Sequence, residues 1–350
     1  MGMTQKSVEL FDEQVRIAVE EEKIPGAVLL AGRNGETMLH KAYGYAQLQP
    51  TREPMTLDTS FDIASLTKLT GTWPAIMRLL QSGRYTLDTK LPDMLDRPMH
   101  PQLREVTLWN LLTHTAGFVP DMWPDRFGAT RLDRIDGLLS LEPIKPRNGQ
   151  VLYSDLSFIF LGEIIAQAYG KPQNEVAREI FDELGMPSTG YLPPRGTYCA
   201  ATEFRANRPT GMEFPVRGSV HDETCEMLGG VAGHAGVFST AADLGRFCAA
   251  IIPDHCHPMF EKEWLIKAFT NQTAFLGENR CLGWIAYHER PEGNIVGHTG
   301  FTGTSMWIDT VSGDYVVLLT NRVHPTRKNS ALAPIRREGF RTVFGVEITA

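Results

Sequence analysis

The chain has 350 residues, with 34 lysines and arginines against 41 aspartates and glutamates, which gives a formal charge of −7. This acidic balance offers no basic surface to nucleic acid or to an anionic membrane, so we expect neither as a partner. No stretch reaches the roughly eighteen apolar residues of a membrane span, and residues 1 to 22 lack the features of a signal peptide. We therefore expect a cytoplasmic protein, with a trimmed secreted protein as the alternative, and the sequence leaves the oligomeric state unknown.

The cysteines favour a reduced compartment. There are five, odd in number and without a C-x-x-C pair, at positions 199, 225, 248, 256 and 281. Cys256 lies between His255 and His257, which raises the question of a metal. Adjacent side chains rarely converge on one ion, and no second pair of ligands follows at zinc spacing. We predict no metal site and no organic cofactor.

Hydrophobic patterns predict the elements in chain order. Residues 8 to 22 have an apolar stripe typical of an amphipathic helix. Two strands follow, from about 26 to 46, around the turn Arg33-Asn34-Gly35. Helical patterns dominate from residue 65 to about 190. Four strands return from residue 283 onward, and a last helix begins at about 334.

Strands at both ends and helices in the middle define an α+β fold. We expect an antiparallel sheet built from both termini and flanked by the terminal helices, with a mostly helical lobe inserted. The predicted sheet lobe comprises residues 1–62 and 240–350, and the helical lobe comprises residues 63–239. The active site is expected between them.

The first candidate motif is Ser65-Leu66-Thr67-Lys68, at a predicted helix start. Residues i and i+3 share one face of a helix about 5–6 Å apart at Cβ, so the lysine can reach the serine hydroxyl. A buried lysine loses its charge more easily and can then serve as a general base. The alternative is a serine N-cap followed by a surface lysine, and S-x-x-K arises by chance about once or twice in such a chain.

The second motif is Tyr153-Ser154-Asp155, where a helix begins near Asp155. A phenol beside a cation has a lowered pKa and can relay protons between nucleophile and leaving group. The alternative is a half-buried aromatic residue followed by an aspartate N-cap.

The third motif is His298-Thr299-Gly300, in what the small residues indicate is an edge strand. Thr299 offers a hydroxyl to a substrate carboxylate or carbonyl, Gly300 permits a close approach of the ligand, and the N–H of Phe301 is a candidate oxyanion donor. The alternative is a glycine-rich strand bend with a surface histidine.

Residues 219 to 236 contain His221, Asp222, Glu223 and His234. One interpretation is a loop over the cleft that helps bind substrate. His221, Asp222 and His234 would then contact and orient the residues that touch the substrate. The other is a buried polar loop whose glycines supply positive φ. Both stay open. We predict a structural, backbone-bonded role for His114.

The three motifs, in this order, resemble the penicillin-recognising serine hydrolases. The resemblance is to the branch that holds the class C β-lactamases, D-Ala-D-Ala peptidases and related esterases. Flanking stretches support it, namely "FDIASLTK", "VTLWNLLTHTAGF" and "GGVAGHAGVFSTAADLGRF". It covers roughly residues 10 to 345, and residues 219 to 236 resemble a segment of a subgroup that includes muramyl-peptide amidases.

The resemblance implies a β-lactamase/transpeptidase-like fold and roles for the motif residues. Ser65 is the implied nucleophile and Lys68 its base, Tyr153 is the proton relay, and the N–H groups of Ser65 and Phe301 form the oxyanion hole. Thr299, Gly300 and Asp155 are expected at the substrate.

Two residues depart from the family pattern. His298, which the resemblance makes the fourth catalytic residue, stands where the family usually has lysine. This weakens a fixed positive charge because histidine is cationic only near or below pH 6.5. Asp155 stands where asparagine is more usual, which adds negative charge beside the nucleophile. Both changes argue against efficient β-lactam hydrolysis.

The sequence therefore predicts a serine hydrolase that cleaves an amide or ester through an acyl-enzyme. The expected substrates are small molecules or short peptides of peptidoglycan type. A carboxylesterase is the next alternative and a β-lactamase the third. A rival from another class is a sensor that captures an acyl ligand without turnover. An S-D-N motif fails at Leu156, and no G-x-S-x-G occurs.

Overall fold

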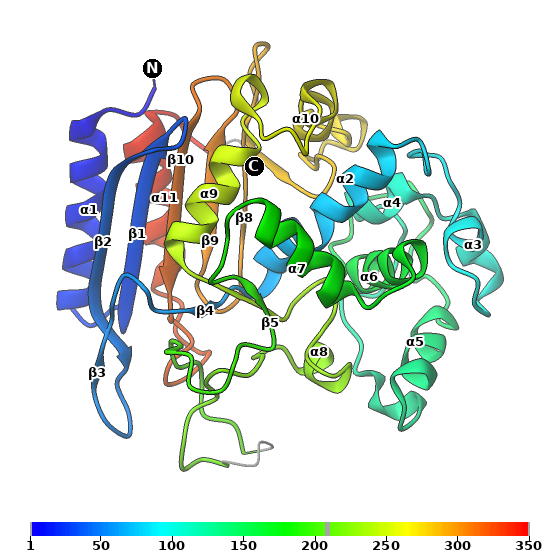
Figure 1. Cartoon of the computed structure of the whole chain (residues 1–350), viewed down its shortest axis with the longest axis horizontal. Coiled ribbons are helices and arrows are strands. Elements are labelled where there is room, and N and C mark those ends of the chain that lie inside the picture. The colour runs from blue at the N-terminus through cyan, green and yellow to red at the C-terminus, as the bar shows by residue number, and fades with distance from the viewer. Residues whose placement is uncertain (1, 207–210, 349–350) are drawn as a thin grey trace.

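The computed structural model describes residues 2–206 and 211–348 and has a seven-stranded antiparallel sheet beside a mostly helical region (Figure 1). The strand order in the sheet is β3-β2-β1-β10-β9-β8-β7. Its strands are β1 (Gly26–Arg33), β2 (Glu36–Gln47), β3 (Glu53–Pro54), β7 (Ile285–His288), β8 (Ile295–Thr299), β9 (Ser305–Asp309) and β10 (Asp314–Thr320). The predicted return of the chain's end to the sheet is confirmed, because β1 pairs directly with β10.

The turn between β1 and β2 has the backbone that its sequence predicts. Asn34 and Gly35 have φ angles of 48° and 88°, and positive φ at both central residues defines the type I′ hairpin turn. This turn matches the twist of its strands and places the long hairpin at one side of the sheet.

Helices cover both faces of the sheet. Helix α1 (Gln5–Glu20) and helix α11 (Leu332–Phe344) lie side by side on one face, and α9 (Ala241–Ala250) crosses the other (Figure 1). Phe11 of α1 packs so closely on α11 that a Cβ at Gly339 would lie 2.1 Å from its ring. The glycine therefore lets the two terminal helices approach each other over the sheet.

The helical region surrounds one apolar helix, α6 (Asp155–Tyr169). Phe158, Ile159, Phe160 and Leu161 are consecutive and all buried, so α6 is a core helix. The other helices here are α2 (Trp73–Gln81), α3 (Leu91–Met94), α4 (Leu108–Thr113), α5 (Arg131–Leu139), α7 (Gln173–Glu183), α8 (Glu223–Met227) and α10 (Lys262–Phe269). Residues 156 to 162 are all buried, so the core encloses the N-terminal half of α6 and fixes where the helix starts.

A second sheet of three short strands lies between the two regions, and the sequence did not predict it. Its strands are β4 (Phe61–Asp62), β5 (Gly190–Tyr191) and β6 (Val237–Ser239), in the order β4-β6-β5. Strands of two or three residues show no alternation that a pattern can detect. This sheet fixes the segment that leads directly into Ser65.

The bounds of the two lobes stay a prediction, and residues 1, 207–210 and 349–350 within them lie outside the described part of the chain. Over residues 2–206 and 211–348, none of the helices has the length and apolar character needed to cross a membrane.

Candidate active site

Ser65 lies on an irregular turn. A helical run begins here as predicted, but it is irregular: a 3-10 turn (Ala64–Leu66) runs into a π-helical turn (Lys68–Thr72) before α2 begins. Ala64 has a φ of 47°, a left-handed conformation that costs energy for a residue with a Cβ. The buried carboxylate of Asp62 holds it there by accepting the N–H of Ala64 at 2.8 Å. The fold thus stores local strain at the serine.

The irregular turn still brings Lys68 to Ser65. The lysine Nζ donates to Ser65 Oγ at 3.0 Å, and the Tyr153 hydroxyl donates to the same oxygen at 3.0 Å. Tyr153 is 88 residues from Ser65 in the sequence, so the tertiary fold brings the two side chains together. The fold therefore holds Ser65 Oγ between the two side chains that the motifs place beside it.

Lys68 is fully buried, so the surface-lysine alternative is wrong. Burial lowers the pKa of Lys68, but Asp155 and Tyr153 raise it, and the balance lies above the usual range of a lysine. Nζ lies 2.7 Å from Asp155 Oδ1 and 4.9 Å from the centre of the Tyr153 ring. At rest Lys68 is therefore an ammonium ion held by a carboxylate.

The start of α6 explains how Asp155 reaches Lys68. The N-cap is Ser154, whose Oγ accepts the N–H of Leu156 at 3.2 Å, so the alternative with Asp155 as the cap is wrong. Asp155 is the first helical residue and its side chain is free to turn to the lysine. Behind it, His114 Nδ1 accepts the N–H of Ser154 at 3.2 Å, which confirms the predicted structural role of His114.

His298 is buried, and its pKa is lowered to about 3 by burial and by the neighbouring cations Arg280 and Lys68. It is therefore neutral at physiological pH, and the alternative of a surface histidine is wrong. Its Nδ1 lies 2.8 Å from the carbonyl oxygen of Thr299, and its ring lies 5.9 Å from the Tyr153 ring.

Strand β8, which carries His298, is not the edge strand that its small residues indicated. Strand β7 lies outside it and pairs with Ile295, Val296 and Gly297. His298 and Thr299 lie beyond these pairs, so the backbone is open only at the end of β8 that faces Ser65.

The loop after β8 is tied to the nucleophile turn. Thr302 Oγ1 donates to the carbonyl of Asp62 at 2.7 Å, and Thr304 Oγ1 donates to the carbonyl of Ile63 at 3.0 Å. A Cβ at Gly300 would lie 2.1 Å from Thr304 Oγ1, so only glycine fits between loop and turn. These contacts hold Phe301 and Ser65 along one cleft.

That cleft has a volume of about 580 Å³. It is lined by the predicted residues Ser65, Tyr153, Asp155, His221, Asp222, His298, Thr299, Gly300 and Phe301. Lys68 and His234 are fully buried and do not line it. The fold therefore gathers segments that are far apart in sequence at one opening.

Residues 219 to 236 lie partly at the cleft and partly buried behind it, and a role in substrate binding stays a prediction. His221 and Asp222 line the cleft, whereas His234 is buried, with Nε2 2.9 Å from Asp222 Oδ1. Burial lowers the pKa of His234, but Asp222 raises it, and the balance is a raised pKa. Gly229, Gly230 and other glycines of the segment have positive φ, as a tightly turned buried loop requires.

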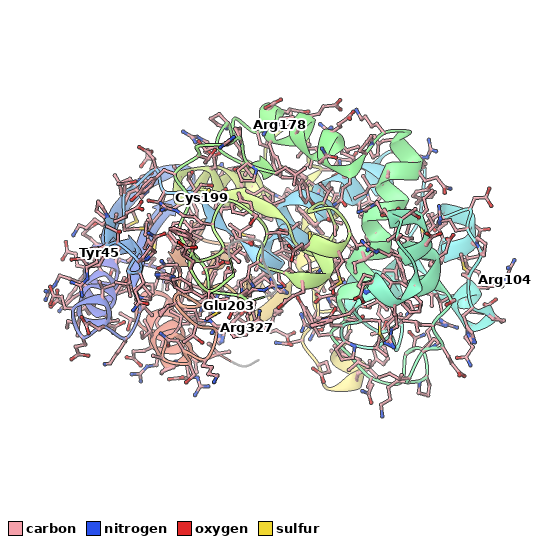
Figure 2. The ribbon with its side chains drawn as sticks, turned by 90° about the horizontal axis from the view of Figure 1, so that it is seen from below. Tyr45, Arg104, Arg178, Cys199, Glu203 and Arg327 are labelled. Atoms are coloured by element: carbon pink, nitrogen blue, oxygen red, sulfur yellow. The ribbon has the colours of Figure 1, made fainter. Side chains whose placement is uncertain are left out.

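His221 is held by a charged network at the mouth of the cleft. Its Nε2 lies 3.0 Å from Glu203 Oε1, and Arg327 Nε donates to the same carboxylate oxygen at 2.6 Å. Figure 2, seen from below, shows Glu203 and Arg327 close together. The ring of Phe301 lies 5.6 Å from the ring of His221, so this network also supports Phe301.

One group of side chains in the described residues has the spacing of metal ligands. One potential ligand atom each from Asp155, Asp222 and His234 lies within 4.8 Å of the others. The ammonium of Lys68 already faces Asp155 here, so a cation is present in the form of the lysine. The sequence also raised the question of a metal at Cys256. There Cys256 Sγ contacts the Phe260 carbonyl, and His257 Nδ1 accepts the Met259 N–H.

Sequence reasoning missed the arginines of the cleft. Arg280 lines it, with its guanidinium carbon 5.2 Å from the centre of the Tyr153 ring. Nη1 of Arg280 is buried, and the described residues give it no hydrogen-bond partner. Arg336 of α11 also lines the cleft and donates to the carbonyl of Thr304 at 2.6 Å. No local pattern marks either residue, because each reaches the site only through the packing of distant segments.

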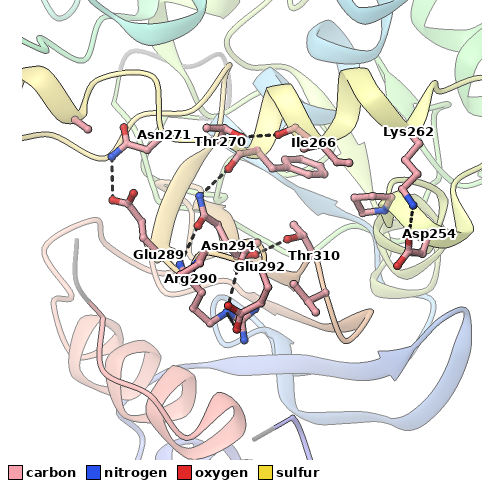
Figure 3. Close-up of a pocket in the computed structure, with 16 residues that line it drawn as sticks. Asp254, Lys262, Ile266, Thr270, Asn271, Glu289, Arg290, Glu292, Asn294 and Thr310 are labelled. Carbon is pink, nitrogen blue, oxygen red and sulfur yellow. Dashed lines mark hydrogen bonds and ion pairs between the residues drawn. The ribbon is translucent and has the colours of Figure 1, made fainter.

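A larger cleft, about 670 Å³, lies between α10 and the turns that connect β7 to β8 and β9 to β10 (Figure 3). Its charged groups already have partners within the cleft. Lys262 Nζ donates to Asp254 Oδ1 at 2.5 Å, and Asn271 Nδ2 donates to Glu289 Oε1 at 2.9 Å. Among the described residues that line it, no nucleophile lies hydrogen-bonded to a base, so size alone does not make it the reaction site.

Comparisons with known proteins agree with the geometry. A profile of the Beta-lactamase family matches residues 11–339. The chain is 29% identical to the N-acetylmuramyl-L-alanine amidase of Bacillus subtilis (strain 168), over 86% of this chain and 78% of that protein. It is also 29% identical to a putative D-alanyl-D-alanine carboxypeptidase of Escherichia coli (strain K12), over 86% of this chain and 79% of that protein.

Solved structures share the fold. A β-lactamase/D-alanine carboxypeptidase from Pseudomonas syringae superposes with a TM-score of 0.76 at 22% identity, covering 97% of this chain and 98% of that one. The octameric penicillin-binding protein homologue from Pyrococcus abyssi gives a TM-score of 0.73 at 21% identity, covering 95% of this chain and 80% of that one.

The chain belongs to the Beta-lactamase family and has the β-lactamase/transpeptidase-like fold that the motifs implied. It is a serine hydrolase of the β-lactamase and penicillin-binding-protein type.

Proposed function

We propose that this serine hydrolase is a peptidase or amidase that acts on small peptidoglycan-type peptides through an acyl-enzyme on Ser65. One observation carries the proposal. Ser65 Oγ accepts hydrogen bonds from Lys68 Nζ and from the Tyr153 hydroxyl, each at 3.0 Å, at the wall of an open cleft. Relatives named as a muramyl-L-alanine amidase and as putative D-alanyl-D-alanine carboxypeptidases support the choice of substrate.

The reaction begins when Ser65 Oγ attacks the carbonyl carbon and its proton leaves toward Lys68. Tyr153, which bonds the same oxygen, delivers a proton to the departing amine or alcohol. A water molecule then attacks the acyl-enzyme, with the proton transfers reversed, and releases the acid. General acid–base help of this kind contributes about 10²- to 10⁴-fold to the rate.

The oxyanion is held by backbone N–H groups. Ser65 lies in the first turn of a helical segment and Phe301 directly follows Gly300, and both residues line the cleft. Fixed donors of this kind stabilise charge that develops in the transition state, and losing one costs about 10²- to 10³-fold in kcat. The hydrogen bonds from Thr302 and Thr304 to the nucleophile turn fix the N–H groups of Ser65 and Phe301 relative to each other.

Arg280 is proposed to bind the substrate's carboxylate. His298 is neutral and supplies no positive charge, whereas Arg280 lines the cleft and its buried Nη1 finds no acceptor among the described residues. A hydrogen bond to a charged group contributes about 1.5–3 kcal/mol. The guanidinium thus compensates for the lysine that the third motif lacks.

Replacing Arg280 by methionine is expected to raise KM for a peptide with a free C-terminal carboxylate about 10- to 100-fold, since each 1.4 kcal/mol is tenfold. The rate with an uncharged ester should change less than about threefold. Steady-state kinetics with both substrates measures the difference. Arg104→Met, at an exposed position far from the cleft, is the matched control (Figure 2). An equal loss on both substrates would refute the carboxylate role.

The function is tested by comparing kcat/KM on four substrates: a peptide ending in D-Ala-D-Ala, muramyl-L-alanine, a p-nitrophenyl ester and a penicillin. The proposal predicts that one of the first two is turned over best and that Ser65→Ala is inactive on all. Turnover of the ester alone would contradict a peptidase and establish a carboxylesterase. A stoichiometric acyl adduct without turnover would establish the sensor.

The carboxylesterase stays the second candidate because of one observation. With a pKa of about 3, His298 leaves the usual lysine position uncharged, and this suits a neutral ester better than an anionic substrate. A β-lactamase stays the third candidate, and the penicillin arm of the substrate comparison tests it.

A further inference from the structure

The hydrogen bonds of Lys68 raise a question about the base. Its Nζ donates to Ser65 Oγ at 3.0 Å, to Asp155 Oδ1 at 2.7 Å and to the carbonyl of His234 at 3.4 Å. A lysine ammonium has three N–H donors and no acceptor, so these bonds use all of them. An ammonium that donates to Ser65 has no lone pair with which to take the serine proton. Lys68 must therefore release one proton as it receives another.

The contacts of Lys68 identify where that proton goes. The carbonyl of His234 is a weak base, and Tyr153 already directs its own proton to Ser65 Oγ. Asp155 offers a carboxylate oxygen at 2.7 Å, the shortest of the three contacts. Its side chain is 19% exposed and lines the cleft, so it can exchange protons with water between turnovers.

We propose that Asp155 is the terminal proton acceptor of acylation in a Ser65–Lys68–Asp155 relay, an inference that rests on the proposed function. The Ser65 proton passes to Lys68 Nζ as the bond from Oγ to the carbonyl carbon forms. In the same step Lys68 gives a different proton to Asp155 Oδ1. Lys68 is an ammonium before and after, Asp155 changes from carboxylate to carboxylic acid, and the negative charge moves to the oxyanion. When the leaving group departs it takes the proton of Tyr153, and the proton held by Asp155 passes through Lys68 to the Tyr153 oxygen, so that all three groups regain their resting protonation.

Two further carboxylates and several basic groups lie around the relay. One carboxylate oxygen of Asp222, at the start of α8, lies within 4.8 Å of one of Asp155. Asp121, in the loop before α5, also repels a second negative charge here. The basic groups that face the relay are Lys68 itself, Arg280 before β7 and His234, whose pKa Asp222 raises, while His298 of β8 is neutral. His234 is paired with Asp222, which leaves Asp155 as the acceptor of Lys68.

The test compares Asp155→Asn with the wild type in the pH dependence of acylation. The probe is p-nitrophenyl butyrate, and intact mass confirms the acyl-enzyme. An asparagine cannot take a proton, so the variant needs neutral Lys68, and the neutral fraction falls tenfold for each pH unit below the lysine's pKa. The wild type needs only the ionised carboxylate. We expect the acid limb of the variant's pH–rate profile to lie at least one pH unit higher than that of the wild type. At pH 6 the variant's acylation rate should be lower by about 10-fold or more.

Two further variants make the result specific. Asp155→Glu keeps a carboxylate and should keep the acid limb of the wild type at a reduced rate. Asp121→Asn removes one charge from the same cleft, but its carboxylate bonds Thr224 and the N–H of Met122 rather than Lys68. Its acid limb should not move upward.

Several outcomes would overturn the relay. One is an Asp155→Asn enzyme with the acid limb of the wild type. Another is a wild-type pH–rate profile whose acid limb lies near the ordinary lysine pKa of about 10.4. This second outcome can be measured even if no variant folds. If Asp155→Asn does not fold, an upward shift in Asp155→Glu would likewise contradict the proposal. A wild type that forms no acyl-enzyme at any pH would instead refute the proposed function.

Discussion

Replacing Lys68 by methionine is expected to lower acylation of Ser65 at least about 10³-fold, because methionine can neither receive nor pass on a proton. Lys68 is fully buried, and its Nζ donates to Ser65 Oγ at 3.0 Å and to Asp155 Oδ1 at 2.7 Å. Methionine fills a similar volume, so the fold should survive. Pre-steady-state release of p-nitrophenol measures the acylation rate directly.

The stability cost of Lys68→Met should be modest beside its effect on rate. The Asp155 side chain loses its partner but is 19% exposed, so water can solvate it. We expect a loss of about 1–3 kcal/mol in the free energy of unfolding, measured by denaturant titration. Lys90→Met is the control, since Lys90 forms an exposed ion pair with Glu105 and such pairs contribute about 0–1 kcal/mol. A Lys68→Met enzyme that acylates within tenfold of the wild type would contradict the mechanism.

Replacing Tyr153 by phenylalanine is expected to lower kcat about 10²- to 10⁴-fold on an amide, because the amine needs a proton to leave. The loss on a p-nitrophenyl ester should be smaller, since p-nitrophenolate leaves without protonation. The ratio of the two losses separates a proton relay from a structural role, which would reduce both alike. Tyr198→Phe is the control, because the Tyr198 hydroxyl bonds the carbonyl of Pro54 at 2.7 Å and Tyr198 does not line the cleft.

Local patterns predicted the parts of the fold that depend on local chemistry. The Asn34-Gly35 turn, the terminal helices and the four C-terminal strands are where the sequence indicated. The π-helical turn after Ser65 and the three-stranded sheet were not predictable in this way. Both exist because distant segments meet, as when the carboxylate of Asp62 accepts the N–H of His221, 159 residues away.

In the candidate site too, contacts between residues close in sequence were predictable and contacts between distant segments were not. Ser65 and Lys68 are three residues apart, and their contact follows from helical spacing. The pairing of Lys68 with Asp155 spans 87 residues, so the sequence placed an aspartate near the nucleophile without revealing that it holds the lysine. Arg280 carried no signal at all, because one arginine in a loop resembles any other until the tertiary fold places it beside Tyr153. The roles of these residues and the cytoplasmic location stay predictions.

The most direct test of the account is the intact mass of the protein after brief exposure to p-nitrophenyl butyrate and, separately, to a penicillin. Wild type and Ser65→Ala are compared. The account predicts a butyryl adduct on the wild type alone, located at Ser65 by peptide mapping, with continuing turnover of the ester. An adduct on Ser65→Ala, or none on the wild type, would contradict Ser65 as the nucleophile.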